Sequence, residues 1–168
     1  MARVLVVDGY NVLLGTPRYS GLADRDIDAA RSALVSDVAL RAQGNIEAIV
    51  VFDGASNPES TGQPHDAAGV TVIFSPYGRD ADSVIEQIVA DRRARGEEVT
   101  LVTSDAETQW LALGHGAQRI SSAEFEREVR EVAAQWREHS PTGSTRHPVE
   151  NRLDRATREA LSRWARWE

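Results

Sequence analysis

Four short apolar runs constrain the fold of this chain more than any other feature. They cover residues 4–7, 48–52, 70–74 and 99–103, and a weaker fifth run covers residues 119–120. Each long run is continuous rather than alternating, and each ends in polar or turn-forming residues such as Asp8-Gly9 and Asp53-Gly54. Continuous runs of this length, rich in β-branched residues, are typical of strands that are buried on both faces of a parallel sheet.

Helical patterns separate these runs, at residues 24–43, 80–95, 106–113 and 122–138. The alternation predicts a doubly wound α/β domain with right-handed crossovers, in which ligands bind at the carboxyl ends of the strands. The segment 54–65 is polar and rich in turn formers, so we expect a mobile loop at that end of the sheet.

The length of 168 residues suits one compact domain and a tail. We expect a domain over residues 1–138, and a linker and a C-terminal helix over residues 139–168. The last helix would present an apolar face that either packs on the domain or docks on another molecule; it includes Leu153, Leu161, Trp164 and Trp167.

The net charge of −7 argues against a protein that coats nucleic acid nonspecifically, because such binding needs many basic contacts to phosphates. The segment 139–168 holds six arginines and four acidic residues, a net charge of +2 that leaves −9 on residues 1–138. An acidic body with a basic tail fits a metal centre with a separate docking element, although a solvated helix is the simpler interpretation of the tail.

Several classes of site are excluded by missing residues. The chain has no cysteine, so any metal must be held by oxygen or imidazole, and the four histidines lack the spacing of zinc ligands. No glycine pattern matches a dinucleotide or triphosphate loop, so we expect no nucleotide cofactor. The N-terminus lacks the features of an export signal, and no run is long enough to span a membrane, so we expect a cytoplasmic protein.

Acidic residues gather where the predicted strands end or the next helices begin. They are Asp8, Asp53, Asp82 and Asp105, with Asp80 beside Asp82. Two unit charges about 4 Å apart repel by about 4 kcal/mol at an effective dielectric constant of about 20, so such a cluster calls for a counter-ion. Magnesium prefers carboxylate oxygens and leaves room for water and a phosphate oxygen. The pattern therefore predicts metal-assisted phosphodiester hydrolysis.

A purely structural interpretation of each aspartate stays open, since Asp is a favoured N-cap. Asp80 or Asp82 would cap the helix 80–95, and Asp105 would cap the helix 106–113. Asp8 is harder to explain in this way, because no immediate helical pattern follows it.

The segment Asp8-Gly9-Tyr10-Asn11-Val12-Leu13 resembles the opening of the NYN domains, relatives of the PIN nucleases, and in particular of their YacP-like branch. Further matching segments keep the family's order at residues 51–53, 72–75, 81–86, 102–105 and 116–122. The resemblance implies a PIN-like Rossmannoid fold of three layers around a central, mainly parallel sheet. It also implies Mg²⁺- or Mn²⁺-dependent endoribonuclease activity on RNA, in some bacterial members on mRNA held at the ribosome.

The resemblance also assigns roles to single residues. Asp8, Asp82 and Asp105 match the metal ligands, and Asn11 matches a polar residue that supports metal or substrate. Asp53 and Asp80 are further candidate ligands, Asp53 in an outer position.

Four residues are candidate substrate contacts: Tyr10, Arg79, Thr103 and Ser104. Tyr10 would either stack on a base or pack internally, whereas we expect Trp110 and Trp136 to pack helices. Arg79 departs from the family pattern and would either pair with Asp80 or contact a phosphate.

Two rival functions would use the same kind of fold or the same kind of residue. A non-catalytic RNA- or ribosome-binding module on the same fold would be expected to lose the ligand acids, which are present here. An aspartyl phosphatase of the haloacid dehalogenase type needs a second Asp two residues after the nucleophile, and position 10 is Tyr.

Overall fold

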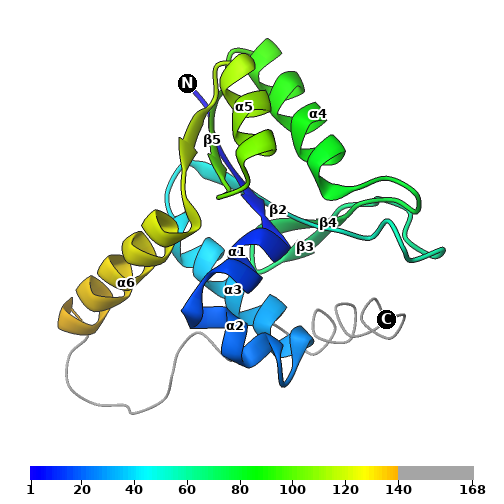
Figure 1. Ribbon diagram of the computed structural model, residues 1–168. Coiled ribbons are helices and arrows are strands. Elements are labelled where there is room, and N and C mark those ends of the chain that lie inside the picture. The colour runs from blue at the N-terminus through cyan, green and yellow to red at the C-terminus, as the bar shows by residue number, and fades with distance from the viewer. Residues whose placement is uncertain (140–168) are drawn as a thin grey trace.

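The computed structural model describes residues 1–139, which form a six-stranded sheet with helices on both faces (Figure 1). The strands are β1 (Arg3–Asp8), β2 (Ile46–Phe52), β3 (His65–Ala67), β4 (Val70–Phe74), β5 (Glu98–Val102) and β6 (Gln118–Ile120). The helices are α1 (Gly9–Gly15), α2 (Pro17–Ala23), α3 (Ile27–Arg41), α4 (Ala81–Ala94), α5 (Ala106–Gly114) and α6 (Ser122–His139). The strand order is β3-β4-β2-β1-β5-β6, and only β3 runs antiparallel to its neighbour.

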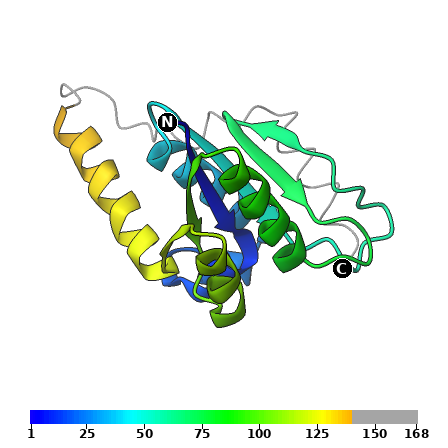
Figure 2. The same cartoon turned by 90° about the horizontal axis from the view of Figure 1, so that it is seen from above.

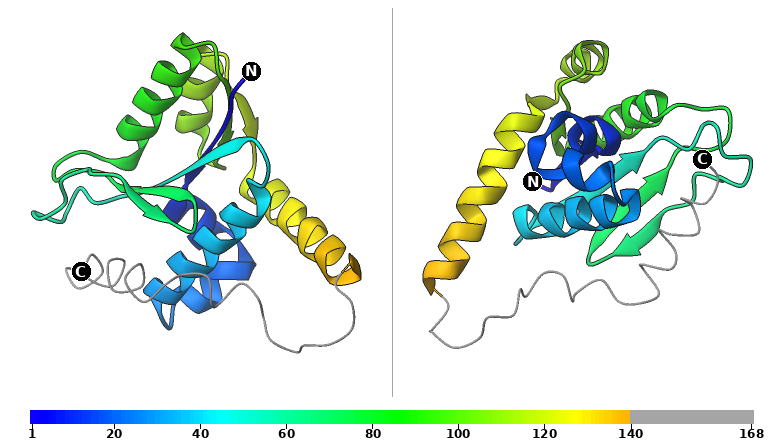
Figure 3. Two further views of the ribbon diagram at one scale, coloured as in Figure 1. Left: turned by 180° about the vertical axis from the view of Figure 1, so that it is seen from behind. Right: turned by 60° about the horizontal axis from the view of Figure 1, so that its bottom comes forward.

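Two apolar cores make three layers, which Figures 1 and 3 show from opposite sides. On one face, Leu34 of α3 and Phe125 of α6 pack with residues of α1, α2 and the sheet. On the other face, Ile85 of α4 and Ala112 of α5 pack on the sheet. Figure 2 shows the far end of α6 leaving the body of the domain. The α/β class, the three layers and the mainly parallel sheet are thus confirmed.

The expected strands and helices match the structure to within a few residues at their ends, apart from three elements that we did not predict: α1, α2 and β3. Helix α1 begins directly after Asp8, so the expectation that no helix follows Asp8 is wrong. Close packing requires Gly9 at the start of α1, because a Cβ at this position would lie 2.4 Å from the Phe52 ring. A short helix of this kind carries too few apolar residues to show a clear period.

The segment 54–65 is anchored, which differs from the mobile loop that its composition suggests. The Gly54 N–H donates to Ser75 Oγ at 2.8 Å, and Ser60 Oγ donates to the Ser75 carbonyl at 2.7 Å. The Tyr77 N–H donates in turn to the Ser60 carbonyl. These hydrogen bonds connect the segment to the loop after β4. The polar groups of turn-forming residues can form hydrogen bonds with a neighbouring loop instead of with water.

Trp110 and Trp136 are 75% and 53% exposed, so the expectation that both pack between helices is wrong. Within residues 1–139, no helix is long and apolar enough to cross a membrane. The expected linker and C-terminal helix lie outside the described residues, except for His139 at the end of α6. The domain boundary at residue 138 stays a prediction.

Candidate functional site

The strand order reverses at β1, since β2 lies on one side of it and β5 on the other. In open α/β sheets, ligands bind beyond the carboxyl ends of the strands at such a switch point. Asp8 is the last residue of β1, and residues 103–105 follow β5 directly. The fold therefore brings Asp8 and Asp105 to the same edge of the sheet.

The Asp8 carboxylate is buried at this edge and is only 7% exposed. Burial is the main reason that its pKa is raised from 3.8 to about 6. The charges of Asp82 and Asp105 also raise the pKa, whereas the hydrogen bonds from Thr103 and from the Asn11 N–H lower it. Asp8 is therefore near enough to Asp82 and Asp105 for their charges to raise its pKa. A buried carboxylate with this pKa is common at functional sites.

Asp82 and Asp105 are joined by one side chain that sequence reasoning missed. Thr108 places its hydroxyl 2.9 Å from Asp82 Oδ1 and 2.8 Å from Asp105 Oδ2. Asp105 also caps α5, because its carboxylate accepts the Thr108 N–H at 2.9 Å, and this bond lowers the Asp105 pKa. The capping role that we left open for Asp105 is thus confirmed, and it coexists with a place in the acidic cluster.

Asn11 links three segments next to the acidic cluster. Its Oδ1 accepts the Ser104 N–H at 2.8 Å and the Ser122 hydroxyl at 3.1 Å. The Ser104 hydroxyl donates to Ser122 Oγ at 3.1 Å. Asn11 thereby ties α1 to the loop after β5 and to the start of α6. Ser122 is the second residue that sequence reasoning missed; the signals for it were its position as the first residue of a predicted helix and its place at the end of the matching segment 116–122.

Asp80 and Asp53 occupy exposed positions around the start of α4. Asp80 caps this helix by accepting the Ser83 N–H at 2.9 Å, and its contacts with Ser83 lower its pKa. Asp53 accepts the Ala55 N–H at 2.9 Å and the Ala81 N–H at 3.3 Å. Both aspartates therefore support the loop and the helix next to the cluster, and their predicted role as ligands stays a prediction.

The predicted substrate contacts lie in different surroundings. The Tyr10 ring packs 5.1 Å from the Phe52 ring, and its hydroxyl accepts a hydrogen bond of 3.0 Å from Arg31 Nε. The Arg79 guanidinium donates to the Ser83 carbonyl and to Gln87 Oε1, on the exposed surface of α4. Thr103 is buried, whereas Ser104 is exposed. Stacking by Tyr10 and phosphate contacts by the other residues stay predictions.

The donor chemistry of the cluster fits a hard divalent cation. Asp8, Asp82 and Asp105 offer carboxylate oxygens, the ligands that Mg²⁺ and Mn²⁺ prefer. Within residues 1–139, no three acidic or imidazole side chains converge closely enough to enclose a cation by themselves. Mg²⁺ is usually held by one or two carboxylates and completed by waters and substrate phosphates, so an open arrangement of this kind suits it.

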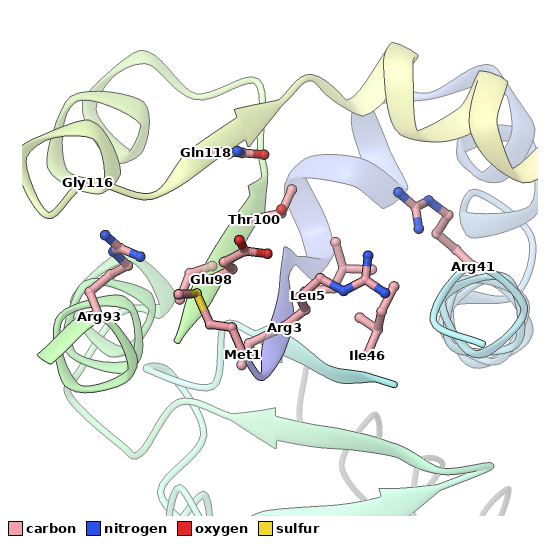
Figure 4. A pocket seen from close by; sticks show the side chains of 12 residues that line it. Met1, Arg3, Leu5, Arg41, Ile46, Arg93, Glu98, Thr100, Gly116 and Gln118 are labelled. Carbon is pink, nitrogen blue, oxygen red and sulfur yellow. The ribbon is translucent and has the colours of Figure 1, made fainter. Parts of the chain in front are cut away.

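A hollow among the described residues lies in another part of the fold. Its volume is about 530 Å³, and it is lined near the amino ends of β1 and β5 by residues that include Arg3, Arg93 and Glu98 (Figure 4). None of the acidic cluster lines it. Because parallel strands carry their amino and carboxyl ends at opposite edges of the sheet, this hollow is separate from the candidate site.

Comparisons with known proteins identify relatives of this chain in sequence and in fold. The sequence pattern of the YacP-like NYN domain family matches residues 5–166. An uncharacterized protein YacP of Bacillus subtilis (strain 168) is 31% identical over 130 residues, which are 77% of this chain and 76% of that protein.

Two crystal structures of Rae1 (YacP) from Bacillus subtilis are also similar. One, of a point mutant, has a TM-score of 0.68 and 27% identity over 97% of this chain and 99% of that one. The other has a TM-score of 0.67 and 29% identity over 80% of this chain and 78% of that one. From its sequence pattern, its relative and its fold, the chain belongs to the YacP-like NYN domain family.

Proposed function

We propose that this protein is a metal-dependent endoribonuclease that hydrolyses phosphodiester bonds of RNA with Mg²⁺ or Mn²⁺. The observation that carries the proposal is the buried Asp8 carboxylate, whose pKa is raised to about 6 beside Asp82 and Asp105. Maintaining these charges together is costly unless a cation neutralises them. Membership of the NYN domain family supports a nuclease with an RNA substrate.

The proposed site assigns a task to each residue around the acidic cluster. Asp8, Asp82 and Asp105 would hold the cation, which supplies Lewis acid chemistry by polarising a phosphate oxygen and lowering the pKa of water. Thr103 holds the Asp8 carboxylate by a hydrogen bond of 3.1 Å. Asn11 keeps the loop after β5 in place through the Ser104 N–H. Exposed Ser104 and Arg79 are the proposed contacts of the RNA backbone.

The proposed partner is mRNA on the ribosome. Two features support it: the family resemblance, and the net charge of +2 in residues 139–168, which contrasts with an acidic body. Basic residues favour contact with phosphates, and the contribution of each contact depends on salt.

The test is cleavage of end-labelled RNA by the full chain, with Mg²⁺ or Mn²⁺ and with EDTA. We expect cleavage only with metal, and we expect Asp8→Asn to abolish it, because the change removes a charge and keeps the shape. Asp91→Asn is the matched control, since Asp91 is exposed on α4 outside the cluster.

Cleavage that survives EDTA would contradict the metal dependence, and an active Asp8→Asn variant would contradict the site. RNA binding without cleavage, under every metal condition, would identify the protein as the non-catalytic module instead. Circular dichroism of each variant checks that the fold is retained.

A further inference from the structure

Thr108 lies between two carboxylates of the acidic cluster. Its side chain is buried, with 1% exposure, and its hydroxyl contacts Asp82 at 2.9 Å and Asp105 at 2.8 Å. Asp82 belongs to the first turn of α4, Asp105 is the N-cap of α5, and Thr108 lies in the first turn of α5. A single hydroxyl therefore joins the N-terminal turns of the two helices that cover one face of the sheet.

The two carboxylates depend on this hydroxyl to different degrees. Asp105 also accepts the Thr108 N–H, so it is held without the hydroxyl. For Asp82, the Thr108 hydroxyl is the one hydrogen-bond donor to the carboxylate within the described part of the chain. A threonine hydroxyl carries a single proton and donates to one acceptor at a time; because Asp105 already accepts the Thr108 N–H, the hydroxyl proton is available to Asp82. The orientation of the half-buried Asp82 side chain therefore rests mainly on Thr108.

We infer that Thr108 is a positioning residue for the divalent cation of this site: its hydroxyl sets the Asp82 carboxylate next to Asp105, and that placement governs how tightly the cation is held. The inference rests on the proposed function, because it concerns the same site. Residues that hydrogen-bond a metal ligand typically change metal affinity or activity by roughly 10- to 100-fold when they are replaced.

Thr108→Val separates this role from helix capping. Valine keeps the backbone N–H that Asp105 accepts, so the cap of α5 is retained. It is also β-branched and of similar size, so it fills the buried position of the threonine. The change therefore removes the two hydroxyl contacts and little else. Thr108→Ser restores the hydroxyl, and Thr108→Ala is a second variant without it.

The experiment is calorimetric titration of Mn²⁺ into the full chain and into these variants, with thermal unfolding as a check of the fold. Thr100→Val is the matched control, because Thr100 lies on β5 in the lining of the separate hollow. We expect Thr108→Val and Thr108→Ala to bind Mn²⁺ roughly 10- to 100-fold more weakly. Thr108→Ser and Thr100→Val should bind as the wild type does. Higher Mn²⁺ concentrations should restore RNA cleavage by Thr108→Val, which a general loss of structure would not permit.

Wild-type affinity for Mn²⁺ in Thr108→Val would overturn the inference. An equal loss of affinity in Thr108→Ser would do the same, because the hydroxyl would then be irrelevant. If the wild-type protein itself binds no Mn²⁺, the proposed metal site fails and the role of Thr108 fails with it. The two failures are therefore distinguished by the wild-type titration.

Discussion

The hydroxyl of Thr103 donates a hydrogen bond of 3.1 Å to the Asp8 carboxylate, although 95 positions separate the two residues in the chain. The same hydroxyl accepts the Asp105 N–H at 3.1 Å. One buried side chain thus fixes the carboxylate at the end of β1 and the start of α5. The positions of Asp8 and Asp105 are consequently set by β1 and β5, the two strands at the switch point.

Replacing Asp8 with Asn should stabilise the metal-free protein at pH 7. The Asp8 pKa is raised from 3.8 to about 6, so the folded state binds this proton more tightly than the unfolded state. The resulting stability is present below about pH 4 and is lost as the pH rises through 6. At pH 7 the ionised carboxylate should cost about 3 kcal/mol, by 1.36 kcal/mol per pKa unit. Urea denaturation in EDTA at pH 7 and pH 4 should show a gain at pH 7 only. An equal gain at both pH values would contradict the burial of a charged Asp8.

Millimolar Mg²⁺ or Mn²⁺ should raise the melting temperature of the wild-type protein. A cation that binds only the folded state stabilises it by mass action, by about 2.7 kcal/mol at 100 times the dissociation constant. The effect should disappear in Asp8→Asn, which lacks the charged ligand. Differential scanning calorimetry in Ca²⁺-free buffer measures the shift in melting temperature. Asp91→Asn is the control variant and should show the wild-type shift. A wild-type melting temperature that is insensitive to both metals would refute the cluster as a metal site.

Asn11→Ala should lower the catalytic rate more than it lowers stability. The change leaves the Ser104 N–H and the Ser122 hydroxyl without their acceptor, at a cost of roughly 1–3 kcal/mol for each group that stays buried. Because Ser104 is exposed, water can replace part of this bond, and the loop after β5 should loosen rather than unfold. Asn11→Asp keeps the acceptor oxygen and should retain the loop. Comparing kcat with the urea midpoint tests this, and equal kcat in wild type and Asn11→Ala would contradict it.

Arg31→Met should destabilise the domain by about 3 kcal/mol, the lower end of the range for breaking a buried ion pair. The Arg31 side chain is 2% exposed, pairs with Asp28 at 3.0 Å and donates to the Tyr10 hydroxyl. The lower value is expected because Asp28 is 32% exposed and water can solvate it once the pair is broken. Arg79→Met, on the exposed surface of α4, is the matched control for urea denaturation. Equal midpoints of the two variants would show that the pair contributes little.

Deleting residues 139–168 should leave the acidic cluster intact but weaken association with ribosomes. All residues of the cluster precede position 109, whereas the deleted segment carries a net charge of +2 and the apolar positions Leu153, Leu161, Trp164 and Trp167. Cosedimentation with ribosomes at two salt concentrations and urea denaturation of both proteins distinguish the alternatives. A large drop in the unfolding midpoint, with ribosome association unchanged, would show that the segment instead stabilises the domain.

The amino-acid sequence alone determined the five parallel strands and the edge of the sheet at which Asp8 and Asp105 lie. A buried parallel strand is recognised by a short continuous apolar run, which is a local property of the sequence. Residues 70–74 therefore form β4 as predicted. The sequence also contained the capping roles of Asp80 and Asp105, because a cap involves only residues three positions apart. Neither result requires knowledge of which strands are neighbours.

Only the tertiary structure decided how the acids are connected. Thr108 contacts both Asp82 and Asp105 because α4 and α5 cover the same face of the sheet. Ser122 donates to Asn11 because α6 begins beside α1. The orientation of Trp110 toward solvent was decided in the same way, since Thr108 and Ala112 occupy the buried face of α5. Hydrophobic periodicity reports which face of an element is apolar, but hydrogen bonds between helix ends depend on strand order and crossover, which no local pattern encodes.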